Sequence, residues 1–148
     1  MTDQPGLPPI SNDELLARFV LFNSRIRADG TVKPDAFMPP PNLDLSVTRH
    51  ALASTAELIW KRGRVVATSS EHCLVGRADV LTDAVRKASP LDTVPAPLPD
   101  DKGHAHIVGW PAEKAGQKIL ALQVANASTF VQAPTQAHET GDGSAICQ

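Results

Sequence analysis

The chain has 148 residues, close to the commonest size of one domain, and it is long enough to bury a core without disulfides or metals. Its net charge is −2, with 14 basic and 16 acidic side chains, and it holds four Phe, two Trp and no Tyr. Proteins that bind nucleic acid usually carry a basic stripe or an aromatic platform, so this composition argues against nucleic acid as a partner. One short basic run, Lys61-Arg62-Gly63-Arg64, is expected at the solvated end of a helix.

The stretch MTDQPGLPPISNDE has neither a positive region nor an apolar one, so we expect no secretory signal. No apolar run approaches the ~20 residues that span a bilayer, and no membrane association is expected. Cys73 lies in a predicted core segment and Cys147 near the end of the sequence, so reduced thiols are expected rather than a structural bridge. These features together predict a cytoplasmic protein.

Residues 1–10 are polar and rich in proline, and we expect them to be flexible. Ser11 and Glu14 then form a capping-box pattern ahead of an apolar face, which predicts a helix that ends between Asn23 and Arg27.

The segment 31–42 cannot be helical because its three consecutive prolines force an extended path. Phe37 and Met38 are expected to anchor this segment to the core. From Leu43 to Val47, apolar and polar residues alternate, which predicts a half-buried strand.

A second capping box, Ser54 to Glu57, predicts a short helix that ends at Gly63. The stretches Arg64–Ser69 and His72–Val75 are expected to form two short strands joined as a hairpin.

Helix signals return from Asp79 to Ala88. The stretch Leu91–Leu98 contains prolines, so a strand there must lie at a sheet edge. After a turn at Asp100–Gly103, the segment HAHIVGW is expected to be the last strand, followed by a helix over 112–128.

In that last helix the predicted apolar stripe is Ala115, Ile119 and Leu122, flanked by Leu120 and Val124. The whole pattern predicts one α+β domain over 11–131. It contains about four helices and a small, mainly antiparallel sheet, and a disordered polar tail follows over 132–148.

His104 and His106 project to the same side of their strand and could offer two imidazoles to one divalent metal, the one cofactor that the sequence suggests. Further ligands would come from elsewhere, and the candidates are His72, Cys73, Asp100 and Asp101. A His-x-His pattern alone is a weak metal signal. Two histidines hydrogen-bonded at a sheet edge or on a partner-facing surface are the commoner arrangement.

His72 and Cys73 are adjacent, so on a strand they point to opposite faces and cannot form a catalytic pair with each other. A small thiol that packs as a hydrophobic side chain is the more common role for Cys73. Arg77 and Asp79 are expected to pair with each other, unless Asp79 caps the following helix.

Four segments occur in a characteristic order: KPDAFMPPP, LSVTR, GRADV and HAHIVGWP. With the helix that follows them, they resemble a group of small bacterial proteins with no assigned activity. The resemblance covers residues 33–125 and implies a bacterial origin and a self-contained domain. It provides no catalytic residues.

Two hypotheses of function remain. The favoured one is a non-enzymatic accessory or protein-interaction module, because the sequence contains no recognisable active-site motif. The proline-rich segments 39–41 and 95–99 can also present extended surface to a protein partner. The other is a small metal-dependent hydrolase that uses His104 and His106. The hydrolase requires a third ligand that reaches the same ion at ~2.0–2.3 Å.

Overall fold

The computed structural model describes residues 8–53 and 55–134. Six strands form one sheet in which every pairing is antiparallel, in the order β4-β5-β2-β1-β3-β6. The strands are β1 (Leu15–Val20), β2 (Leu45–Arg49), β3 (Gly76–Leu81), β4 (Asp92–Pro95), β5 (His104–Val108) and β6 (Thr129–Gln132). The helices are α1 (Ala56–Ser69), α2 (Thr82–Lys87) and α3 (Lys114–Ala127), with short 3-10 turns η1 (Asn23–Arg25), η2 (Pro34–Phe37) and η3 (His50–Leu52).

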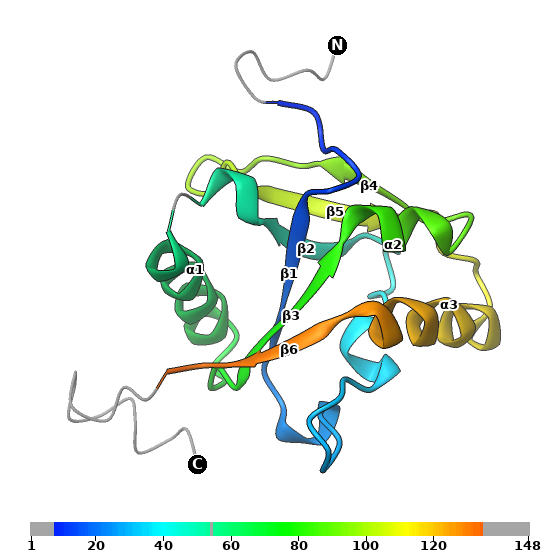
Figure 1. Cartoon of the computed structure of the whole chain (residues 1–148), viewed down its shortest axis with the longest axis horizontal. Coiled ribbons are helices and arrows are strands. Elements are labelled where there is room, and N and C mark those ends of the chain that lie inside the picture. Colours follow the sequence, from blue (N-terminus) through cyan, green and yellow to red (C-terminus); the bar gives the residue numbers. More distant parts are fainter. Residues whose placement is uncertain (1–7, 54, 135–148) are drawn as a thin grey trace.

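The expected α+β class with an antiparallel sheet is confirmed, with three α-helices in the described residues rather than about four. Figure 1 shows α1 on one side of the sheet and α2 and α3 on the other. The larger core lies on the α2/α3 side, where Phe37 of η2 is fully buried, as its predicted anchoring role requires. A smaller cluster of Ala17, Phe19 and Ile59 lies between the sheet and α1. None of the helices in the described ranges is long and apolar enough to cross a membrane.

The predicted helix over 11–27 is wrong, because this segment contains β1, which pairs with both β2 and β3. Leu16 and Val20 face the larger core while Ala17 and Phe19 face α1. A strand buried on both faces is apolar at nearly every position, so its sequence also satisfies a helical pattern. The Ser11 hydroxyl donates to Asp13 at 2.6 Å and does not cap a helix.

The helix predicted after the second capping box is confirmed, but its N-cap is Thr55, one residue later than predicted, whose side chain accepts a hydrogen bond from the Leu58 N–H at 3.2 Å. It does not end at Gly63 but continues to Ser69, so the predicted strand over 64–69 is wrong. A Cβ atom at Gly63 would lie 2.8 Å from the Phe19 ring. This glycine therefore serves close packing of α1 on β1 rather than helix termination.

The predicted strand over 72–75 is also wrong: these residues form an irregular link into β3. Residues 79–81, expected to be helical, complete β3, and α2 begins only at Thr82. The strand predicted at 43–47 is confirmed as β2, shifted towards Arg49, and the proline-containing edge strand is confirmed as β4.

The segment HAHIVGW forms β5 as expected but is not the last strand, because β6 follows α3 and includes Gln132 from the predicted tail. Residues 135–148 of that tail, and 1–7 of the predicted flexible N-terminus, lie outside the described residues. At the end of β5, Gly109 has φ +97° and packs so closely on the Pro90 carbonyl that a Cβ atom would overlap it. The Trp110 indole then donates to the Ile107 carbonyl at 2.9 Å, which holds this tight turn against the sheet.

The helix α3 is confirmed, and so is the burial of the flanking residues Leu120 and Val124, but the predicted centre of its apolar face is wrong. Ile119 is 61% exposed and Leu122 is 40% exposed. Two apolar stripes run along this helix, and periodicity cannot choose between them. The stripe that packs against η2 and β3 consists of Gln117, Leu120, Ala121, Val124 and Ala125.

Candidate functional site

The two histidines predicted as a site lie on the sheet face opposite the larger core, since their neighbours Ala105 and Ile107 belong to that core. His104 is held through both ring nitrogens: Nδ1 lies 2.9 Å from the Ala96 carbonyl oxygen and Nε2 lies 3.1 Å from the Ser46 hydroxyl. Nδ1 therefore donates to the carbonyl, and in the neutral ring Nε2 accepts from the hydroxyl. His104 is thus engaged by protein groups on both sides.

His106 packs edge-on against His104, with their ring centroids 4.9 Å apart. Burial lowers the pKa of His106 below its ordinary value, and the neighbouring His104 lowers the pKa further, while Asp44 opposes the shift. A neutral imidazole at this position is the form that can bind a metal.

The candidate third ligands do not complete a metal site. Asp101 and Asp100 lie 3.0 Å and 3.5 Å from the guanidinium nitrogens of Arg62. Their charges therefore balance Arg62 and not a metal ion. His72 instead packs edge-on against Phe22, at 4.7 Å between ring centroids. Within residues 8–53 and 55–134, no three His, Cys, Asp or Glu side chains are grouped so that they could hold a metal ion.

Cys73 is disulfide-bonded, so the expectation of a reduced thiol at this position is wrong. Cys147 lies outside the described residues. The bonded sulfur of Cys73 is not available as a nucleophile. Because the thiol is not reduced, it does not support a cytoplasmic location.

A second histidine site, not identified from the sequence, is built on the face of the sheet that carries α1. The His50 Nε2 atom lies 2.9 Å from Asp79 Oδ1. Arg77 Nε lies 3.1 Å from each oxygen of Asp79, as the predicted pairing of these two residues requires. The Arg77 guanidinium lies 4.5 Å from the centre of the Trp60 ring on α1. The side chains of His50, Asp79 and Arg77 are only 18%, 12% and 12% exposed.

The topology explains why His50 meets Asp79. In the sheet, β1 lies between β2 and β3, and Ala17 of β1 pairs with both Thr48 and Asp79. His50 follows the end of β2, and its side chain pairs with Asp79 of β3, the strand on the other side of β1.

A buried ion pair joins Glu14 to Arg49, the residue next to His50 in the chain. Arg49 Nε and Nη2 lie 2.7 Å and 2.9 Å from the two oxygens of Glu14, and the Arg49 side chain is completely buried. Glu14 and His50 both line an open depression of about 380 Å³, together with Ser11, Asp13, Leu15 and Ala51. The one signal in the sequence that could have indicated this site is the adjacent basic pair Arg49-His50, which follows the alternating segment 43–47.

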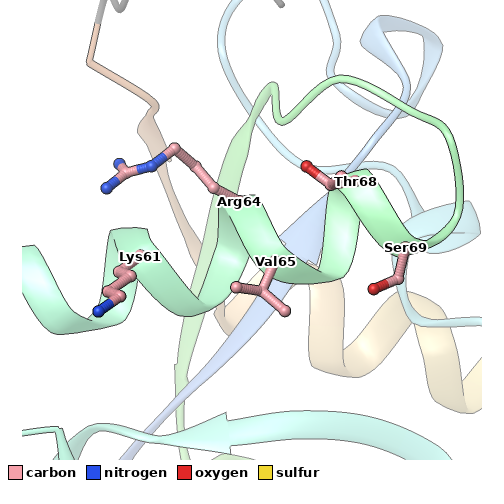
Figure 2. A pocket seen from close by; sticks show the side chains of 5 residues that line it. All are labelled: Lys61, Arg64, Val65, Thr68 and Ser69. Atoms are coloured by element: carbon pink, nitrogen blue, oxygen red, sulfur yellow. The ribbon is translucent and has the colours of Figure 1, made fainter. Parts of the chain in front are cut away.

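A second depression, of about 450 Å³, lies on the outer surface of α1 and is lined by Lys61, Arg64, Val65, Thr68 and Ser69. Figure 2 shows Lys61 and Arg64 beside the same depression on α1, with their charged ends directed away from each other. These groups do not converge on one point. The run Lys61–Arg64, expected at a helix end, lies inside α1, where Arg62 pairs with Asp101.

The two edges of the sheet differ in chemistry. The β4 edge contains Pro95, a residue that lacks an N–H and blocks further strand pairing. The β6 edge, Thr129–Gln132, contains no proline and no charged residue, and it pairs only with β3 in the described part of the chain. Its side chains are half-buried or exposed.

Comparison of the chain with models of protein families, with curated proteins and with solved structures found no match.

Proposed function

We propose that this protein is a non-enzymatic interaction module that binds an extended segment of a partner protein along β6. The observation that carries the proposal is the difference between the two sheet edges. An edge strand presents a row of backbone N–H and C=O groups to solvent, and proteins usually protect such a row with prolines, charges or a covering element. The β4 edge has this protection in Pro95, whereas β6 is neutral and free of proline.

An extended peptide can add to such an edge as a further strand. Its main-chain hydrogen bonds supply affinity, and alternate side chains supply specificity. Phe130 and Val131 are partly buried and offer apolar surface on opposite faces of β6. The partner is therefore expected to carry a short segment of alternating apolar residues.

A partner segment fits this edge better than a second copy of the chain. The strand β6 has four residues. Pairing two such strands about a two-fold axis buries far less than the ~1,000 Å² that a stable interface needs. A flexible segment can extend beyond the strand and cover more surface.

The test compares a double variant of β6, Thr129→Lys with Val131→Lys, with the matched variant Val94→Lys on β4, where Val94 is 37% exposed. Each protein is used as bait, retained proteins are identified by mass spectrometry, and folding is checked by circular dichroism. A partner retained by the wild type and by Val94→Lys but lost from the β6 variant supports the proposal. Equal retention by all three, or repeated failure to retain any partner, overturns it. A dimer in native mass spectra that only the β6 variant loses would assign the edge to a second copy and overturn the partner assignment.

A further inference from the structure

The depression beside His50 has the chemistry of a binding site, and none of the residues that line it belongs to β6. We propose that it binds a primary alkylammonium group, with His50 and Asp13 as hydrogen-bond acceptors. This group can be a free amine or the side chain of a lysine.

The orientation of His50 is set by a chain of contacts behind it. Arg77 donates to both oxygens of Asp79, so this carboxylate is ionised and can only accept hydrogen bonds. His50 Nε2 must therefore carry the proton that is shared with Asp79 at 2.9 Å. In the neutral imidazole the lone pair is then on Nδ1.

The Nδ1 atom of His50 is available to a ligand. No described residue forms a hydrogen bond with it, and it is not among the buried polar atoms that lack a partner. His50 lines the depression, and in its neutral form the ring would offer Nδ1 as an acceptor to a ligand there. Little conformational freedom remains to be lost when a donor binds, because the ring is already oriented by Asp79.

The other polar groups in the depression are also acceptors. Asp13 accepts a hydrogen bond from Ser11 at 2.6 Å and forms no ion pair within the described ranges. The carboxylate of Glu14 is already neutralised by Arg49. Asp13 therefore leaves the depression with an excess of negative charge.

No lysine or arginine side chain lines the depression, and three arginines of the adjoining elements are each paired with a carboxylate. The pairs are Arg49 with Glu14, Arg77 with Asp79, and Arg86 with Asp92. A ligand that suits the site must therefore be a cation with several N–H donors, and an ammonium group has three. Leu15, which is 39% exposed, and Ala51 provide apolar surface for the methylene stem of such a ligand.

The first test uses the wild-type protein and two cations of equal charge. n-Butylammonium chloride has N–H donors, whereas tetramethylammonium chloride has none, and sodium chloride controls ionic strength. The readout is the NMR signal of the His50 ring. Saturable shifts with n-butylammonium, at a roughly millimolar dissociation constant and without a response to tetramethylammonium, support the proposal. No shift, or equal shifts with both cations, overturns it.

The second test uses variants. His50→Gln is expected to weaken n-butylammonium binding by at least about tenfold, measured by calorimetry, whereas the matched variant His72→Gln leaves it unchanged. Equal binding by both variants overturns the proposal. Titration with Nα-acetyl-lysine amide then distinguishes the source: comparable affinity indicates a lysine side chain, and loss of affinity indicates a free amine. Neither result depends on the β6 edge, so failure here leaves the interaction-module proposal to its own test.

Discussion

Arg49 and Glu14 form a two-point ion pair that is closed off from solvent, with nitrogen–oxygen distances of 2.7 Å and 2.9 Å. Arg49 ends β2, while Glu14 directly precedes β1, so the pair joins these two strands at the same end of the sheet. Arg49 Nη2 also donates to the Pro9 carbonyl at 3.2 Å, which ties the N-terminal segment to the same guanidinium. The pair therefore positions both the strand and the segment that borders the His50 depression.

Removing one charge of this pair is expected to destabilise the protein strongly. Glu14→Gln keeps the shape of the side chain but leaves Arg49 buried without a counter-charge, which should cost about 3–5 kcal/mol in urea unfolding at neutral pH. The control is Asp92→Asn, because the Arg86–Asp92 pair is 2.7 Å long but 32% and 55% exposed. This control should cost less than about 1 kcal/mol. Equal losses for the two variants would show that the buried pair does not hold the strands together.

Stability should depend on pH through His106. Burial lowers the pKa of His106 in the folded protein, so below pH ~6.5 the unfolded chain binds a proton more readily than the folded one. Stability is therefore expected to fall as the pH drops from about 6.5 towards the folded-state pKa, and to be unaffected by this group at higher pH. The measurement is the free energy of unfolding of wild type and His106→Gln between pH 8 and pH ~5. An unchanged acid slope in the variant would contradict the assignment.

The turn after β5 requires glycine at position 109. Gly109→Ala is expected to destabilise the protein by more than about 2 kcal/mol, because it adds a Cβ atom against the Pro90 carbonyl to the strain of a positive φ. Gly30 provides the matched control, since its φ is +88° but no atom lies within 4 Å of an added Cβ. Gly30→Ala should cost only about 1 kcal/mol. Thermal unfolding of the two variants separates contact from strain, and a larger loss for Gly30→Ala would refute this explanation.

Two neighbouring residues of α3 test which face of the helix is buried. Leu120 is 9% exposed and packs in the larger core, so Leu120→Ala should cost about 2–4 kcal/mol. Ile119 is 61% exposed, and Ile119→Lys should change stability by less than about 0.5 kcal/mol. Chemical denaturation of both variants is sufficient. The opposite ranking would mean that the stripe predicted from periodicity is the one that packs.

Segments with strong local signals were predictable from the sequence alone. The alternation before Arg49, the prolines after Leu91 and the turn before His104 identified β2, β4 and β5, because each signal excludes a helix within a few residues. The length of the apolar pattern after Pro111 likewise identified α3. The sequence also singled out His104 and His106, which lie together on one face as their spacing requires.

Where the apolar residues of a segment fit both a helical and a strand period, long-range contacts set its secondary structure. LLARFV, expected in a helix, is the strand β1 because strands on both sides satisfy its backbone and both of its faces are covered. RVVATS, expected as a strand, continues α1 because Gly63 allows this helix to lie directly on Phe19. Local propensity differs too little between the two states to outweigh such contacts.

The His50 site depends on the same tertiary choice. His50 and Asp79 are 29 positions apart and belong to different elements, so no motif could join them. They meet because β1 lies between β2 and β3, which brings the end of β2 close to β3. The residue types alone show which side chains can do chemistry, whereas the order of strands in the sheet brings particular ones within hydrogen-bonding distance.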